Sequence, residues 1–198
     1  MKSRIGKSSR QGAYALMAML LIMLGWSQQA TAANHALDAP ASLVFIMRHA
    51  IAPGTGDPPG FRLGDCATQR NLSNEGIRQA QDIGKRLKAN GIAPTTIWSS
   101  QWCRAVDTAN NLGLGPIKPL QALNSFFSQP GQGAEQMKTL ERFIANLDPA
   151  KGPYIMVTHQ VVVTTLTGVF PSSGEGVWIR LTGDRKKPWV VQADVALR

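Results

Sequence analysis

Two histidines in this chain follow apolar runs at equivalent places. Arg48 and His49 come directly after the run Leu43–Met47, and His159 follows a second run, Tyr154–Val157. Short apolar runs of this kind are typical of buried strands. In open α/β sheets, ligands bind where the carboxyl ends of strands meet, so both imidazoles are expected at one binding edge.

Phosphorus chemistry is the reaction that these residue types fit. A phosphate monoester carries nearly two negative charges near neutral pH, and a guanidinium fork matches its oxygens. A neutral histidine can attack phosphorus, and a second imidazole can stabilise the charge on the oxygens in the transition state. Arg104 is expected in the first turn of a helix, where the helix N-terminus adds positive charge. The pattern indicates phosphoryl transfer through a phosphohistidine.

Four segments resemble, in order, the signature segments of the histidine phosphatase superfamily. They contain Arg48-His49-Ala50, Leu72-Ser73 with Gly76, Ser99-Ser100 with Arg104-Ala105 and Thr108-Ala109, and Thr158-His159, and together they span about residues 42–182. The resemblance implies that His49 is the phosphorylated nucleophile and that His159 completes its pocket. It also implies that Arg48 and Arg104 bind the phosphoryl oxygens. Members are phosphatases or phosphomutases and generally need no metal, so no cofactor is expected.

The sequence departs from the family pattern in two places. Ala50 stands where the signature has glycine, a small change that fits if the backbone there is not restricted to glycine. Members usually supply a carboxylate between the second arginine and the second histidine, to protonate the leaving oxygen. Glu135 is the preferred candidate, and Glu175 and Asp65 are alternatives. Without such an acid, the enzyme should favour good leaving groups such as acyl phosphates or phosphohistidine.

Alternating strand and helix patterns predict an α/β fold, a three-layer α/β/α sandwich with a mostly parallel central sheet, over residues 33–198. Residues 50–70 read as a long loop rich in glycine and proline, and residues 116–130 as irregular. Ser73 is expected to cap the first helix. The predicted strands are 42–47, 96–99 and 154–157, with edge strands 177–181 and 189–193, and the predicted helices are 74–89, 102–112, 135–146 and 161–169.

The N-terminal 32 residues are typical of a secretory signal peptide. A basic head is followed by an apolar stretch of 14 residues, Ala13–Trp26, and then by the small-x-small pattern Ala30-Thr31-Ala32. A spanning helix needs about 20 residues, so the stretch is short for an anchor, although an uncleaved anchor is the competing interpretation. The segment predicts a periplasmic or secreted protein, with membrane contact only if the signal segment stays uncleaved.

The chain has two cysteines, Cys66 and Cys103. Paired cysteines usually form a disulfide in the oxidising compartments that exported proteins reach. A Cys66–Cys103 disulfide is therefore predicted, and it would tie the long loop to the start of a helix. Two separate buried thiols are the alternative.

Charge and composition limit the kinds of binding partner that can be expected. The formal net charge is +9, and it falls to +5 without the four cations of the basic head. No basic stripe with interleaved aromatics is present, so nucleic-acid binding is not expected. Two histidines without a nearby carboxylate pair make a poor zinc site, so no metal site is expected.

The sequence thus predicts an exported phosphatase that hydrolyses small phosphate monoesters through a phosphohistidine. A non-catalytic protein that binds phosphorylated ligands, and a phosphomutase, are the alternatives. The sequence does not indicate the substrate's identity or the oligomeric state.

Overall fold

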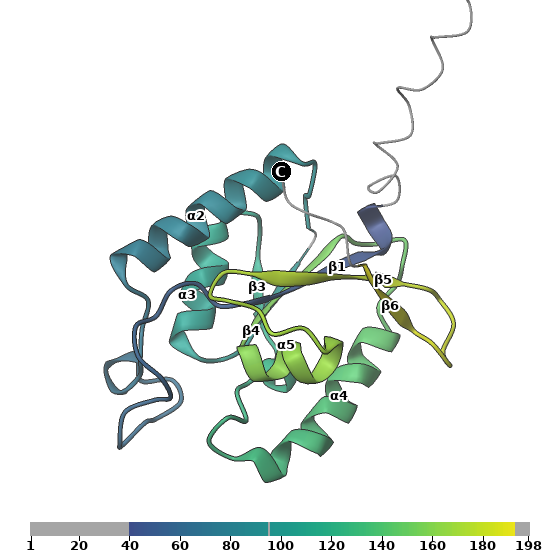
Figure 1. Cartoon of the computed structure of the whole chain (residues 1–198). Helices are drawn as coiled ribbons and strands as arrows, with labels where there is room; N and C mark the ends of the chain where they lie inside the picture. Colours follow the sequence, from purple (N-terminus) through teal and green to yellow (C-terminus); the bar gives the residue numbers. More distant parts are fainter. Residues whose placement is uncertain (1–39, 95, 193–198) are drawn as a thin grey trace, which may run out of the picture. The chain divides into compact units, whose positions relative to one another are not determined.

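A six-stranded sheet forms the centre of the computed structural model, which describes residues 40–94 and 96–192 (Figure 1). The predicted signal segment and the predicted domain start at residue 33 lie outside the described residues. The strand order is β3-β2-β4-β1-β5-β6. The strands are β1 (Leu43–Arg48), β2 (Ile97–Ser99), β3 (Ile117–Pro119), β4 (Tyr154–Thr158), β5 (Gly176–Leu181) and β6 (Trp189–Gln192).

The sheet is mostly parallel, as the sequence predicted. The pairs β1–β4, β2–β4 and β2–β3 are parallel, whereas β1–β5 and β5–β6 are antiparallel. Only β5 therefore runs against the other strands of the described sheet. The central strands β1 and β4 are buried almost throughout, which agrees with their continuous apolar sequences.

Helices cover both faces of the sheet, so the described residues form the predicted α/β/α sandwich. In Figure 1, α2 and α3 lie on one face, and α4 and α5 lie on the other. The helices are α2 (Asn74–Ala89), α3 (Cys103–Leu112), α4 (Gly133–Ala145) and α5 (Gln160–Thr167), and the short 3₁₀ turns are Pro40–Ser42, Cys66–Thr68, Gln121–Leu123 and Pro130–Gln132. No helix among the described residues is long and apolar enough to cross a bilayer.

Local sequence explains where α2 begins and how closely it packs. Ser73 caps the helix as predicted, because its side chain accepts a hydrogen bond from the backbone N–H of Gly76. A Cβ atom at Gly84 would lie 1.9 Å from the carbonyl oxygen of Leu112, at the end of α3. Only glycine permits this approach, so α2 and α3 form one tightly joined layer.

The main apolar core lies between the sheet and the α4–α5 layer. Buried side chains of α4 at helical spacing, Met137, Leu140 and Ile144, pack with Val162 and Val163 of α5. The inner faces of the central strands complete this cluster with Val44, Ile46, Tyr154, Met156, Val177 and Ile179. The strand ends that carry the polar residues are thus held by a fully packed layer.

The register of β1 and β4 brings the two predicted histidines together. Arg48 pairs with Thr158, so His49 and His159 follow at the same edge of the sheet. The backbone N–H of His49 donates to the carbonyl of Thr158 at 2.8 Å, which extends the ladder past the strand ends. Two imidazoles far apart in the sequence therefore become neighbours.

Three details of the predicted elements were wrong. Residues 117–119 were expected to be irregular but form the edge strand β3, because their backbone pairs with β2. β5 is not an edge strand, since it lies between β1 and β6. The helix after β4 was predicted because a parallel strand should follow it, yet the strand that follows is the antiparallel β5.

Candidate active site

A cavity of about 440 Å³ lies at the carboxyl ends of β1 and β4. The structure brings all four predicted side chains of the sequence constellation to its lining: Arg48, His49, Arg104 and His159. The ring centroids of His49 and His159 are 5.5 Å apart, and the rings meet edge to face. This spacing leaves both rings within reach of one tetrahedral group bound between them.

His49 is held in one tautomer. Its Nδ1 lies 2.7 Å from the carbonyl oxygen of Ala50, and because a carbonyl can only accept, Nδ1 carries the proton. The neutral ring then has its lone pair on Nε2, which accepts a hydrogen bond from Nε of Arg104 at 3.2 Å. Nε2 is therefore the nitrogen of His49 that has a lone pair available to act as a nucleophile.

The surroundings of His49 keep its ring neutral. Burial, assisted by the positive charges of Arg104, Arg70 and Arg48, lowers the pKa of His49 to about 3, although the hydrogen bond to Ala50 acts in the opposite direction. A neutral ring is the form that can attack phosphorus. The His49 ring therefore stays neutral across the neutral and mildly acidic pH range.

His159 is also buried and uncharged. Burial lowers its pKa well below the usual value, with His49 and the three arginines acting in the same direction. Its Nε2 lies 2.8 Å from the hydroxyl of Ser100, which also bonds to Asn124. These contacts fix the ring beside the cavity and explain why Ser100, which directly follows β2, is buried.

The arginines supply the positive charge of the cavity. Arg104 lies in the first turn of α3 and only 3% of its side chain is exposed. Arg48 is half-buried, and its Nε is buried without a hydrogen-bond partner among the described residues. An unsatisfied guanidinium donor is costly to bury, so a bound oxyanion would satisfy it.

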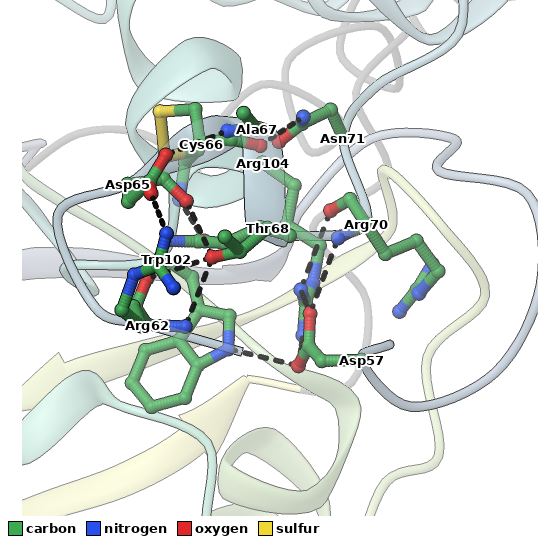
Figure 2. The surroundings of a disulfide bond; sticks show 12 residues. Asp57, Arg62, Asp65, Cys66, Ala67, Thr68, Arg70, Asn71, Trp102 and Arg104 are labelled. Carbon is green, nitrogen blue, oxygen red and sulfur yellow. Dashed lines mark hydrogen bonds and ion pairs between the residues drawn. A yellow bond between two sulfur atoms is a disulfide. The ribbon is translucent and has the colours of Figure 1, made fainter. Parts of the chain in front are cut away.

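Sequence reasoning missed two further charged residues of the lining, Asp57 and Arg70. The carboxylate of Asp57 accepts hydrogen bonds from NH1 and NH2 of Arg104 at 2.5 and 3.2 Å, and from the indole N–H of Trp102 at 3.0 Å (Figure 2). Both residues belong to the long loop, whose path no periodic pattern reveals. The one sequence feature that could have indicated Asp57 is its place between Gly56 and Pro58 in this loop.

The strand end is joined to two helices by backbone contacts. The N–H of Ala50 donates to the hydroxyl of Thr108, which itself donates to the carbonyl of Arg104. A Cβ atom at Gly76 would lie 2.0 Å from the carbonyl oxygen of Ile51, so only glycine fits where α2 passes the segment after His49. The residues of the sequence signatures therefore hold His49 and Arg104 in a fixed relation.

The predicted disulfide is present between Cys66 and Cys103 (Figure 2). It joins the long loop to the first residue of α3, next to both Trp102 and Arg104. Arg70 holds the same loop from inside, since its Nε donates to the carbonyl of Gly56 at 2.7 Å and its NH1 bonds to the carbonyl of Ala52. The loop that carries Asp57 is thus anchored at both of its ends.

Residues 44–127 match the family model described as the histidine phosphatase superfamily, branch 1. The match contains the three arginines of the cavity, Arg48, Arg70 and Arg104, and the first histidine, His49. These residues therefore belong to the histidine phosphatase superfamily. No curated protein sequence matches the chain.

Solved structures of several phosphatases share the fold. The protein histidine phosphatase SixA in complex with tungstate is 16% identical, with a TM-score of 0.53 over 76% of this chain and 94% of that one. The mycobacterial glucosyl-3-phosphoglycerate phosphatase in complex with VO3 is 16% identical, with a TM-score of 0.55 over 78% and 98%. The phosphoserine phosphatase of Entamoeba histolytica in complex with 3-phosphoglyceric acid is 13% identical, with a TM-score of 0.56 over 76% and 95%.

The carboxylates predicted as the acid of this superfamily site lie elsewhere. Glu135, on α4, does not line the cavity: 74% of its side chain is exposed, and its carboxylate lies 3.4 Å from Lys138 and 3.8 Å from Arg142. Glu175 bonds to the backbone N–H of Ser172, and Asp65 pairs with an exposed arginine of the loop. None of the three candidate acids is among the residues that line the cavity.

Two parts of the cavity lining differ in charge. The charged wall consists of Arg48, Asp57, Arg70 and Arg104, together with the neutral ring of His49 that they surround. The neutral wall consists of Gln121, Asn124, Ser125, Ser128, Gln129, Gln132, Gln136 and Gln160. Three aromatic side chains, Phe61, Trp102 and Phe127, also line the cavity, and the rings of Phe61 and Trp102 stack at 5.0 Å. No group of three His, Cys, Asp or Glu side chains in the described part of the chain could hold a metal ion.

Proposed function

We propose that this member of the superfamily is an exported phosphatase, which hydrolyses phosphate monoesters through a phosphohistidine at His49. One observation carries the proposal: Nε2 of His49 bears a lone pair and lies within a group of three guanidinium ions. A nucleophile and a cationic oxyanion site in one small cavity are the two requirements of phosphoryl transfer. The membership of the superfamily and its phosphatase neighbours support phosphatase-type activity.

In the first step, the phosphoryl oxygens bind the guanidinium groups of Arg48 and Arg104. Nε2 of His49 leaves its hydrogen bond with Arg104 and attacks phosphorus opposite the leaving oxygen. The hydrogen bond from Nδ1 to the carbonyl of Ala50 stabilises the positive charge that develops on the ring. His159 stabilises the equatorial oxygens from its fixed place beside His49.

In the second step, water attacks the phosphohistidine. The N–P bond breaks, the electron pair returns to Nε2 of His49, and inorganic phosphate leaves the arginines. Because burial and the nearby cations favour the neutral imidazole, they make His49 a good leaving group in this step. The same environment therefore serves both halves of the reaction.

The neutral wall supports a small substrate whose leaving group is polar but uncharged. Its glutamines and serines can donate and accept hydrogen bonds, yet none of them attracts a second anion. Exposed Phe127 and the stacked pair Phe61–Trp102 add apolar surface on which a ring or carbon chain can lie. A substrate with one phosphoryl group and a hydroxyl-bearing body matches these features.

Export is supported by two independent features. The first 32 residues have the pattern of a signal peptide. The Cys66–Cys103 disulfide belongs to the bonds that form and persist in oxidising compartments. We infer that the protein works in the periplasm or outside the cell.

Release of inorganic phosphate from a panel of phosphate esters tests the proposal. The purified mature protein should hydrolyse 4-nitrophenyl phosphate, and His49→Asn should reduce release to the background. Equal rates for the two proteins would refute the proposal, and so would ligand binding without turnover. Transfer of the phosphoryl group to a second hydroxyl of the substrate, without release, would instead identify a mutase.

A further inference from the structure

Asp57 is the one carboxylate side chain that lines the described cavity. It lies against the phosphoryl-binding residue Arg104 with two charge-assisted hydrogen bonds, and 13% of its side chain is exposed. Trp102 donates a third hydrogen bond to it from the indole nitrogen. Figure 2 shows the carboxylate between these two side chains, which follow each other closely in the chain.

The loop around Asp57 is built to present this side chain. Behind it, the backbone N–H of Arg70 lies 3.4 Å from Oδ1 of Asp57, and the Arg70 side chain bonds to the carbonyl groups of Ala52 and Gly56. The disulfide then ties the loop to the start of α3. A carboxylate on an anchored loop can act at a defined point of the cavity.

Asp57 and a phosphoryl group require the same hydrogen-bond donors. NH1 and NH2 of Arg104 are both bonded to the carboxylate, and a guanidinium fork binds a phosphoryl group through these same atoms. A bound phosphoryl group must therefore replace Asp57 as the acceptor of at least one of the two Arg104 hydrogen bonds. The carboxyl group of Asp57 then lies beside the phosphoryl oxygens. Two anionic groups in contact retain one proton between them, as in paired carboxylates.

We propose, on the basis of the phosphohistidine mechanism above, that Asp57 is the general acid that protonates the leaving oxygen. The N–P bond to Nε2 of His49 forms as the P–O bond breaks, the leaving oxygen keeps the electron pair, and Asp57 gives it the proton. In the second half of the reaction, the Asp57 carboxylate takes a proton from the attacking water. Its proton is thereby restored, and the P–N electron pair returns to Nε2.

The charges around Asp57 favour a carboxyl group that takes up a proton when the substrate binds. In the free protein, burial raises the pKa of Asp57, but the hydrogen bonds from Arg104 and Trp102 outweigh burial and lower it overall. A phosphoryl group that takes over the Arg104 fork removes this stabilisation and adds negative charge beside the carboxylate. Both changes raise the pKa of Asp57, so the carboxyl group is protonated when the substrate is bound.

The test compares Asp57→Asn with the wild type over a series of esters of decreasing leaving-group acidity, from 4-nitrophenyl phosphate through phenyl phosphate to an alkyl phosphate. A poor leaving group needs the proton and a good one does not. We expect kcat/KM of Asp57→Asn to change less than about threefold for 4-nitrophenyl phosphate and to fall on the order of 10²-fold for the alkyl ester. Glu135→Gln, at the exposed acid position on α4, is the matched control and should leave the whole series unchanged.

Affinity for vanadate separates this role from a positioning role. Loss of the internal anion should make Asp57→Asn bind vanadate severalfold more tightly than the wild type. Weaker vanadate binding, with an equal loss of kcat/KM for every ester, would mean that Asp57 only holds Arg104 in place and would overturn the proposal. An unchanged ester series would overturn it as well.

Two controls keep the outcomes separate. If Asp57→Asn does not fold, as judged from its urea unfolding, Asp57→Ala provides the same ester series. The proposed function itself is tested by the wild type and His49→Asn with 4-nitrophenyl phosphate, where Asp57 is not required. Activity that depends on His49, with no leaving-group effect at Asp57, would refute only the role of Asp57.

Discussion

The charged wall and the neutral wall of the cavity are organised differently. In the charged wall, Arg104 bonds to both His49 and Asp57, and Arg70 bonds to the loop backbone, so each charged group is held by another part of the protein. In the neutral wall, Gln129 and Gln132 are exposed, whereas Asn124, Ser125 and Gln136 bond to neighbouring backbone. The difference indicates that the charged wall is a fixed part of the cavity, whereas the neutral wall is a more adaptable surface.

Within the charged wall, replacing the proposed nucleophile His49 should give the largest loss of activity. We expect His49→Asn to lower kcat/KM for 4-nitrophenyl phosphate by at least about 10³-fold, because no other side chain of the lining replaces the attacking nitrogen. Steady-state phosphate release measures the effect. A variant within tenfold of the wild type would show that the charged wall does not work through a covalent step at His49.

Replacing the guanidinium group of Arg104 should give the next largest loss of activity. Arg104→Lys keeps the charge but removes the paired donors, so kcat/KM should fall on the order of 10²-fold. Arg62→Lys is the matched control, since Arg62 belongs to the long loop, is 68% exposed and does not line the cavity. Equal activity of the two lysine variants would show that charge alone, without the fork, explains the charged wall.

The disulfide should matter through stability. The double variant Cys66→Ser, Cys103→Ser opens a link across 37 positions, and the free energy of unfolding should fall by about 3–4 kcal/mol. Urea unfolding of the oxidised wild type and of the variant gives the difference. A loss below about 1 kcal/mol would mean that Arg70 and its backbone contacts hold the loop without help.

Neutral histidines make the charged wall sensitive to acid. The pKa of His49 is about 3 in the folded protein and about 6.5 in the unfolded chain, so only the unfolded chain takes up this proton between those values. Stability should therefore fall on acidification, by at most about 1.4 kcal/mol per pH unit for this site. Urea unfolding at pH 6 and pH 5 should show a smaller loss for His49→Asn than for the wild type, and equal losses would contradict this assignment.

A substitution in the neutral wall should have the smallest effect on the kinetics. Gln132→Glu places a negative charge on an exposed position of that wall, and KM for a phosphate ester should rise roughly fivefold, corresponding to about 1 kcal/mol. Gln81→Glu adds the same charge at an exposed position of α2, outside the cavity lining, and should leave KM unchanged. Equal KM values for the two variants would mean that the neutral wall does not contact the substrate.

The sequence was sufficient for the parts of the site that regular elements position. Apolar runs predicted the ends of β1 and β4, and the capping residue Ser73 predicted the start of α2, so the neighbourhood of His49 and His159 followed from strand pairing. Arg104 was predictable because it lies in the first turn of α3 and because its segment resembles a signature of the family. These inferences depend on local periodicity and on the geometry of parallel strands.

The path of the long loop and the position of Asp57 in the cavity were beyond this reasoning. The path of residues 50–70 depends on contacts across the fold, such as Arg70 with Gly56 and Asp57 with Arg104, and no pattern in the sequence specifies them. Glu135 has the expected place along the chain, but the rotation of α4 turns it to solvent. Short β3 was missed because three residues carry too little periodicity to distinguish a strand from a loop.

Direct detection of phosphate on His49 tests the central claim most directly. The wild-type protein is mixed with 4-nitrophenyl phosphate, quenched in alkali within milliseconds and digested, and the peptide that contains His49 is examined by mass spectrometry. The mechanism predicts a phosphorylated His49 that survives alkali, is lost in mild acid and is absent from His49→Asn. Turnover without phosphate on His49, or with phosphate on another residue, would contradict the mechanism.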